Sequence, residues 1–159
     1  FQIVQPFVGL SVRENILVGA HLHHRARDAA LVVAGRVGRD LGLTDMLDRP
    51  ADTLTVAARK RLELARALAT KPKLLLADES LGGLDHAEME RAADMLGNIR
   101  SRMGITIVWV EHIMGVLMRV VDRVIVLDHG EKIFEGTPAQ AAVDPRVTEV
   151  YLGKKKAAS

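Results

Sequence analysis

Two hydrophobic patterns alternate along the second half of this 159-residue chain. Short continuous apolar runs, typical of buried strands, are separated by stretches in which apolar residues recur every three or four positions, as on one side of a helix. The runs predicted as strands are 74–77, 105–110 and 123–128, and a turn at 128–130 leads into a hairpin partner at 132–136. Strands alternating with helices predict an α/β fold with a parallel sheet covered on both faces.

The region from 8 to about 53 has only helical patterns. Ser11 and Glu14 have the spacing of a capping box, in which each side chain bonds the other residue's backbone amide, so a first helix is predicted to begin there. A second helix is predicted over 28–43, and a short third helix with Thr44 as its cap. This region is therefore predicted to be a small all-helical unit.

Stronger helical signals follow. An amphipathic helix is predicted to begin at Thr55 and to end before Pro72, which cannot continue it. Another is predicted over 86–102 with Asp85 as its cap, and a short one over 113–120. Two further short helices are predicted near the C-terminal end, each beginning with a cap residue followed by proline: Thr137-Pro138 and Asp144-Pro145.

Composition narrows the class of protein. The 22 lysines and arginines nearly balance the 20 acids, which argues against a dedicated nucleic-acid surface. The absence of cysteine excludes disulfides and thiolate metal sites. The longest apolar stretch, 105–110, is far shorter than the ~20 residues that cross a bilayer, so any membrane association is expected to be peripheral.

Two adjacent acids, Asp78 and Glu79, follow the strand at 74–77. Parallel strands deliver their C-terminal ends to the ligand crevice. An Asp at that point can hold Mg²⁺ on a nucleotide, and a neighbouring Glu can orient or deprotonate an attacking water. A pair of acids in a turn after a strand is the purely structural alternative, and this motif alone does not decide between them.

Two other segments bear on the choice. The strand at 105–110 is followed by Glu111 and His112, so His112 is expected at the same edge, where its imidazole could donate to a phosphate. A surface histidine is the alternative for that residue alone. Thr55 is predicted at a helix start, where free amides form an anion site. An ordinary N-cap is compatible with that role.

These motifs, in this order, resemble the ATP-binding subunit of an ABC transporter. LLLADE resembles the Walker B strand with its catalytic glutamate, SLGGLD the D-loop, and WVEH the switch-histidine strand. LTVAA stands at the signature position, and the glutamine of FQ resembles that of the Q-loop. Segments such as VRENILVGA and VIVLDHGEKIFEGTPAQAAVDPRV are similar to the branched-chain amino acid uptake branch.

The resemblance implies a role for each motif. Glu79 would polarise the attacking water and His112 would stabilise the γ-phosphate, which makes both catalytic. ATP and Mg²⁺ are the implied cofactors, with Asp78 and Gln2 as the metal-binding residues. Asp85 would couple two sites of a dimer. The helix start, Thr55 with Val56 and Ala57, would serve the nucleotide of the opposite subunit.

Two departures from the family pattern stand out. Val56 and Ala57 replace signature glycines that let a backbone approach phosphate closely. No G-x-x-x-x-G-K-[ST] phosphate loop occurs, and the chain starts at Phe1. We therefore expect the C-terminal part of a longer subunit with its Walker A motif upstream; a protein without Walker A is the alternative.

The predicted fold is a partial P-loop NTPase of ABC type: a helical subdomain plus the C-terminal part of the parallel-sheet core. The predicted divisions are the Q-loop edge (1–7), the helical subdomain with the signature helix (8–70), the α/β core (71–136) and a C-terminal helical extension (137–159). The expected function is ATP hydrolysis that powers import of branched-chain amino acids, by an intact subunit on the cytoplasmic face of the cell membrane; this fragment alone is expected to be inactive.

The implied partners are a second ATPase subunit and transmembrane permease subunits, which the Q-loop and the helical subdomain would contact. Nucleic acid is not an expected partner. The alternatives are the ATPase of another ABC importer or exporter, a non-transport ABC ATPase, and a non-catalytic fragment. His21, His23 and His24 are interpreted as a solvated basic segment rather than a metal site.

Overall fold

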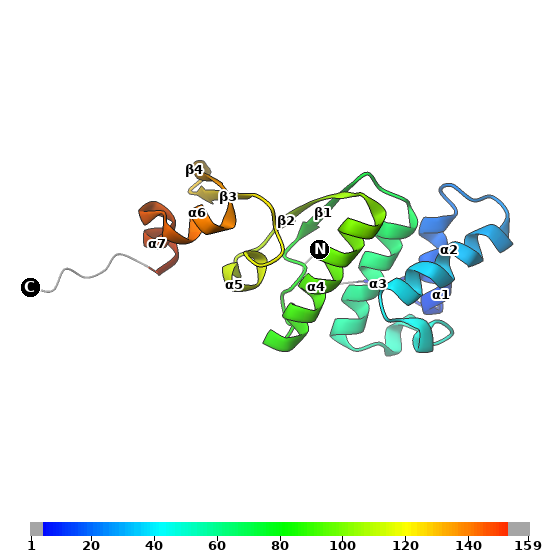
Figure 1. Ribbon diagram of the computed structural model, residues 1–159. Helices are drawn as coiled ribbons and strands as arrows, with labels where there is room; N and C mark the ends of the chain where they lie inside the picture. Colours follow the sequence, from blue (N-terminus) through cyan, green and yellow to red (C-terminus); the bar gives the residue numbers. More distant parts are fainter. Residues whose placement is uncertain (1–4, 153–159) are drawn as a thin grey trace, which may run out of the picture. The chain divides into compact units, whose positions relative to one another are not determined.

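A computed structural model describes residues 5–152, which form two compact units divided between His112 and Ile113 (Figure 1). The prediction for Gln2 lies outside the described residues. The first unit begins with a helical bundle of α1 (Val12–Ala20), α2 (Arg27–Asp40) and α3 (Val56–Ala69), with two single turns, η1 (Thr44–Met46) and η2 (Ala51–Thr53), between α2 and α3.

The caps of α1 and α3 agree with the sequence. Ser11 and Glu14 form the predicted capping box, and the Thr55 hydroxyl accepts a hydrogen bond from the amide of Ala58. The prediction for Thr44 is wrong, because Leu43 occupies the cap position and Thr44 is the first residue of η1. η1 is a single 3-10 turn without a side-chain cap hydrogen bond, and it does not continue into the predicted third helix.

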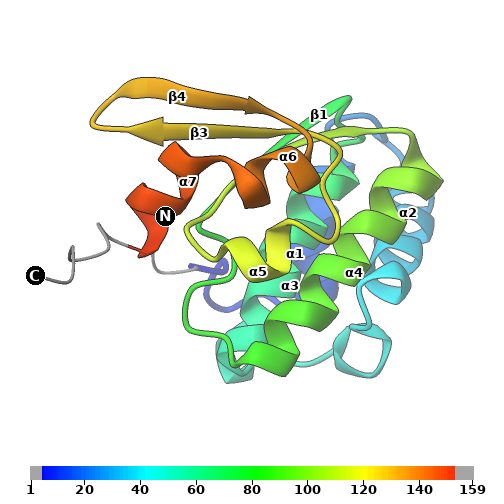
Figure 2. The ribbon, with the colours of Figure 1, turned by 60° about the vertical axis from the view of Figure 1, so that its left-hand side comes forward.

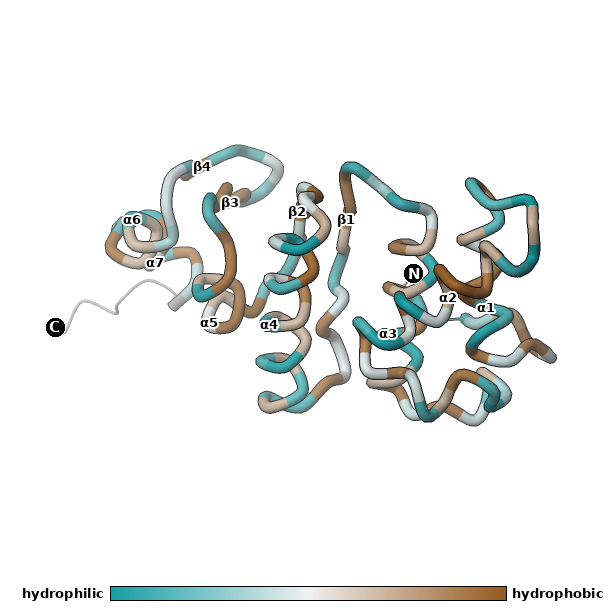
Figure 3. Tube along the Cα trace, turned by 45° about the vertical axis from the view of Figure 1, so that its right-hand side comes forward, coloured by the Kyte–Doolittle hydropathy of each residue, from teal (hydrophilic) through white to brown (hydrophobic). Residues whose placement is uncertain are grey.

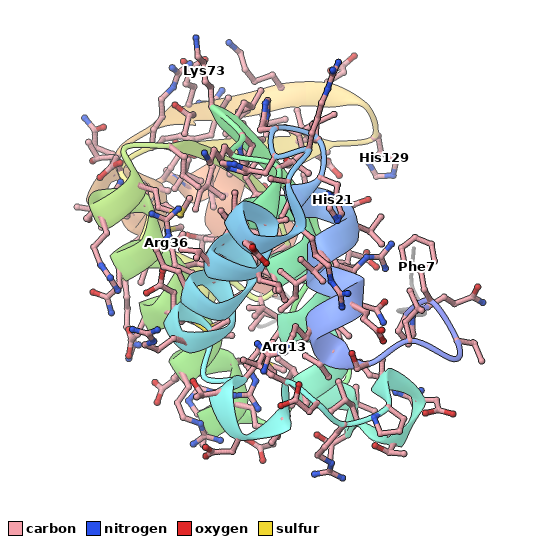
Figure 4. The ribbon with its side chains drawn as sticks, turned by 90° about the vertical axis from the view of Figure 1, so that its right-hand side faces the viewer. Phe7, Arg13, His21, Arg36, Lys73 and His129 are labelled. Atoms are coloured by element: carbon pink, nitrogen blue, oxygen red, sulfur yellow. The ribbon has the colours of Figure 1, made fainter. Side chains whose placement is uncertain are left out.

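α1 packs against both α2 and α3. The core includes side chains that are almost fully buried, such as Ile16 on α1 and Leu62 on α3. Burying one such side chain stabilises the fold by about 1.5–3 kcal/mol. At the surface, Arg13 of α1 bonds both carboxylate oxygens of Asp48, at 2.8 and 3.1 Å, and this contact lowers the pKa of Asp48 (Figure 4).

The same unit continues with β1 (Leu74–Asp78), α4 (His86–Met103) and β2 (Thr106–Val110). β1 and β2 pair in parallel, with Leu76 opposite Val108 and Asp78 opposite Val110. Asp85 caps α4 as predicted, in a capping box with Glu88. The parallel pairing confirms the α/β prediction for these two strands.

The expectation of a sheet covered on both faces is wrong for the described residues. Leu75, Ile107 and Trp109 face the core, whereas Leu76 is 70% exposed and Val108 is 48% exposed on the opposite face. An uninterrupted apolar run can occur in a strand whether one or both faces of its sheet are covered. The sequence pattern therefore could not distinguish these two cases.

The second unit contains α5 (Met114–Leu117), β3 (Val124–Asp128), β4 (Glu131–Gly136), α6 (Pro138–Val143) and α7 (Pro145–Leu152). The strands form the predicted antiparallel hairpin (Figure 2), and β3 is hydrophobic except at its last residue, Asp128 (Figure 3). Within the second unit β3 pairs with β4 in a two-stranded sheet. His129 and Gly130 both have positive φ, as a two-residue hairpin turn requires, so the partner of β3 is its nearest neighbour in sequence.

Candidate functional site

The C-terminal end of β1 carries two exposed carboxylates. Asp78 is the last residue of the strand, and the amide of Glu79 extends the ladder by donating to the carbonyl of Val110 at 2.9 Å. Glu79 has a φ of 44°, in the left-handed region that costs a non-glycine residue about 1–3 kcal/mol. Such a conformation persists only where its surroundings hold it.

His112 lies at the same edge of the sheet. It follows Val110 by two residues, and Val110 is the register partner of Asp78. The ends of both strands therefore place Asp78, Glu79 and His112 along one edge, and all three residues are exposed. The structure thus brings together three residues that the sequence predicted for the site.

The loop that follows Glu79 is held at consecutive residues. Lys60 of α3 donates to the carbonyl of Ser80 at 2.9 Å, and the indole of Trp109 donates to its hydroxyl at 2.9 Å. The amide of Leu81 donates to a carboxylate oxygen of Glu111 at 2.7 Å. We call residues 79–85 the acidic loop; it starts at Glu79 and ends at Asp85, the cap of α4.

The start of α3 lies beside the acidic loop. A Cβ atom built on Gly83 would be 4.0 Å from a methyl carbon of Val56. Thr55 and Val56 are exposed and Ala57 is half-buried, so the first turn of the helix reaches the surface. Its first amides have no partner within the helix, which makes this turn suitable for an anion.

The segment before α1 is fixed to two helices. Asn15 of α1 is fully buried and bonds the backbone of Phe7. Arg66 of α3 lies 4.2 Å from the centre of the Phe7 ring and donates to the carbonyl of Gln5 at 3.2 Å. Phe7 itself projects from this segment (Figure 4). The contacts hold the chain that follows the predicted Q-loop.

Sequence reasoning missed several of the residues that shape this region. Trp109 packs against the core, and its indole also reaches the acidic loop. Asn15, Arg66, Lys60 and Glu111 were not singled out. Glu111 offered one signal, an acid between an apolar strand and His112, but its partner is thirty positions away in sequence and the strand register is needed to find it.

The carboxylates suit a magnesium ion that is also held by a ligand. Mg²⁺ is usually bound through one or two carboxylates together with phosphate oxygens and waters. Among the described residues neither Asp78 nor Glu79 has a side-chain hydrogen-bond partner, so their oxygens are open to such a ligand. No group of three or more metal-binding side chains is found within residues 5–152.

Comparison with protein families gives two matches. The family described as "ABC transporter" matches residues 1–82. The family described as "Branched-chain amino acid ATP-binding cassette transporter" matches residues 131–157. Within residues 5–152, no helix is both long enough and apolar enough to cross a membrane.

Similar proteins carry matching names. The branched-chain amino acid transport ATP-binding protein BraF of Pseudomonas aeruginosa is 30% identical over 97% of this chain, and LivG of Escherichia coli K12 is 31% identical over 97%. The chain spans 66% of the length of each of these relatives.

Solved structures share the fold. MJ1267, an ATP-binding cassette of an ABC transporter, has a TM-score of 0.80 and 25% identity, with 95% of this chain and 66% of that chain covered. The cbiO1 protein of Clostridium perfringens, part of the ABC transporter complex cbiONQ, has a TM-score of 0.82 and 25% identity, with 93% and 60% covered.

Proposed function

The chain belongs to the ABC transporter family, and from this premise we propose that it belongs to an ATP-hydrolysing subunit that powers import of branched-chain amino acids. The observation that carries the hydrolytic role is the shared edge of β1 and β2, where Asp78, Glu79 and His112 end two paired parallel strands. A nucleotide phosphate at this edge would meet an acid for the metal, an acid for water and an imidazole donor.

Each residue at the edge has one task in the proposal. Asp78 would hold Mg²⁺, directly or through water, and bound Mg²⁺ would neutralise charge on the phosphate oxygens. Glu79 would accept a hydrogen bond from the attacking water and orient it, or take its proton. His112 would donate to the γ-phosphate. Gln2, the second proposed metal-binding residue, lies outside the described residues.

The start of α3 and the end of the acidic loop face a second subunit in the proposal. Thr55 and the amides of Val56 and Ala57 would bind the nucleotide held by that subunit, and Asp85 would couple the two sites. The short distance between Val56 and a Cβ built on Gly83 supports this assignment, because the two elements are then neighbours. Permease subunits would contact the Q-loop and the helical subdomain, and the subunit would then lie on the inner face of the membrane.

The solute is inferred from the relatives. BraF and LivG are named for branched-chain amino acid transport, and a family of that description matches residues 131–157. Uptake of radiolabelled leucine by cells with and without the intact subunit tests this part of the proposal. Normal leucine uptake in cells without the subunit would contradict branched-chain amino acids as the solute. It would not contradict the ATPase role.

Substitution Glu79→Gln in the intact subunit tests the hydrolytic role. Gln keeps the size of the side chain and removes its basicity, so turnover should fall by ~10²–10⁴ while ATP binding is retained. Glu131→Gln is the matched control, because Glu131 is an exposed acid in the β3–β4 hairpin. Turnover within about twofold of wild type in the Glu79 variant would refute the assignment.

A further inference from the structure

We propose that Glu111 is a positioning residue that, with Lys60 and Trp109, clamps the acidic loop and thereby fixes the direction of the Glu79 side chain. The inference rests on the proposed ATPase function and adds a role for a carboxylate beside His112. It does not place Glu111 in contact with the nucleotide.

The contact between Glu111 and Leu81 is the central bond of the clamp. The amide of Leu81 donates to Oε1 of Glu111 at 2.7 Å, which is short for a backbone donor and agrees with a bond to a carboxylate. Leu81 itself is 1% exposed, so the loop is fixed here by both its backbone and its side chain. The other oxygen of Glu111, Oε2, is buried and has no hydrogen-bond partner among the described residues.

Bonds on both sides of Glu79 restrict its backbone. On the N-terminal side, the Glu79 amide donates to the carbonyl of Val110 and so belongs to the β1–β2 ladder. After it, Ser80 is held by Lys60 and Trp109, and Leu81 is held by Glu111. A residue with left-handed φ between two fixed points has little freedom to rotate. The clamp therefore maintains the strained conformation that directs the Glu79 carboxylate.

The clamp also joins three parts of the proposed site. Lys60 lies on α3, five residues after Thr55, and Trp109 and Glu111 flank the end of β2 just before His112. A movement of any one of these elements changes the bonds at Ser80 or Leu81. The orientation of the proposed general base is therefore tied to the position of the helix whose first turn is proposed to bind nucleotide.

Two substitutions of Glu111 separate positioning from overall stability. Glu111→Ala removes the acceptor, so in the intact subunit kcat should fall by ~10–10² while KM for MgATP stays within about twofold, as expected for a small misplacement of a catalytic group. Glu111→Gln keeps an oxygen acceptor for the Leu81 amide and should restore kcat to within about threefold of wild type.

Glu14→Ala is the matched control, because Glu14 also accepts a hydrogen bond from a backbone amide, that of Ser11 at 2.8 Å, but lies away from the acidic loop at the start of α1. It should lower the melting temperature and leave kcat unchanged at a temperature where the protein is folded. Hydrogen exchange gives a second readout: Glu111→Ala should speed exchange in a peptide that covers 79–85, and Glu14→Ala should not.

The outcomes are distinguishable from failure of the proposed function. If Glu79→Gln keeps normal turnover, the ATPase role itself fails. If Glu79→Gln is inactive while folded Glu111→Ala keeps kcat and exchange at wild-type values, only the clamp is overturned. A Gln variant as slow as the Ala variant would also overturn it, because the amide acceptor would then be insufficient. Should Glu111→Ala not fold, Lys60→Met supplies the same test through the Ser80 carbonyl.

Discussion

Asn15 and Phe7 form a reciprocal hydrogen-bond pair. Oδ1 of Asn15 accepts from the Phe7 amide at 2.8 Å, and Nδ2 donates to the Phe7 carbonyl at 3.3 Å. The same nitrogen is also within bonding distance of the carbonyls of Leu10 and Ser11. One buried side chain therefore ties the segment after the predicted Q-loop to the first turn of α1.

Removing this side chain should destabilise the first unit. Asn15→Ala leaves buried backbone groups without partners, at about 1–3 kcal/mol for each unsatisfied group. Asn15→Asp should be at least as harmful, because a carboxylate oxygen would then face carbonyl oxygens. Urea denaturation followed by circular dichroism measures the loss. Asn98→Ala, on the exposed side of α4, serves as control and should stay within about 0.5 kcal/mol.

Thr55 and Ser11 are two N-caps of the same chemistry, and only Thr55 is proposed to face a nucleotide. Each Ala variant should lose ~0.5–2 kcal/mol of stability. In the intact subunit, Thr55→Ala should also lower ATP turnover by ~10-fold or more, the size of a lost bond to a charged group, whereas Ser11→Ala should not. Equal turnover in the two folded variants would show that Thr55 is a cap and nothing else.

His24 should make the first unit sensitive to acid. Its partial burial, together with the positive charges of Lys71, His23 and Arg36, lowers the pKa of His24 (Figure 4 shows Arg36 on α2). The unfolded chain then binds a proton at His24 more readily than the folded chain does. The contribution of neutral His24 to the stability of the folded state is therefore complete above the ordinary histidine pKa of ~6.5 and is lost as pH falls toward the lowered pKa. His24→Gln should flatten the fall in melting temperature between about pH 7.5 and 5.5.

The control for this prediction is His86→Gln, because the His86 side chain is 79% exposed at the start of α4. That variant should retain the fall in melting temperature that His24→Gln removes. A His24→Gln variant that retains the full acid dependence would contradict the assignment to His24.

The exposed face of the β1–β2 sheet should make the 159-residue chain self-associate. Leu76 and Val108 are adjacent apolar residues on that face, and exposed apolar patches drive association. Leu76→Lys with Val108→Glu places opposite charges across the pair and should lower the associated fraction in sedimentation without loss of helix content. Leu75→Lys, which alters the neighbouring residue that is 7% exposed, should instead unfold the unit. Unchanged association in the charged pair would exclude this face as the cause.

The local features of the fold were predictable because their causes are local. A helix start is stabilised by a side-chain acceptor next to its first free amides, so Ser11, Thr55, Asp85 and Thr137 could be identified from the local sequence, and all four act as caps. Thr44 has the same chemistry but lies in a single 3-10 turn, which shows that a cap residue predicts a helix only where an amphipathic pattern follows.

The sequence by itself determined the elements and the chemistry available at their ends: two apolar strands, each followed by groups that can act on a phosphate. Tertiary structure decided which groups meet. The parallel register placed His112 beside the acids. Two loops are held by side chains that are distant in sequence: Asn15 bonds Phe7, eight positions away, and Glu111 bonds Leu81, thirty positions away. Helix period and capping depend on neighbours along the chain, whereas a hydrogen bond between distant residues exists only once packing has fixed the distance between their backbones.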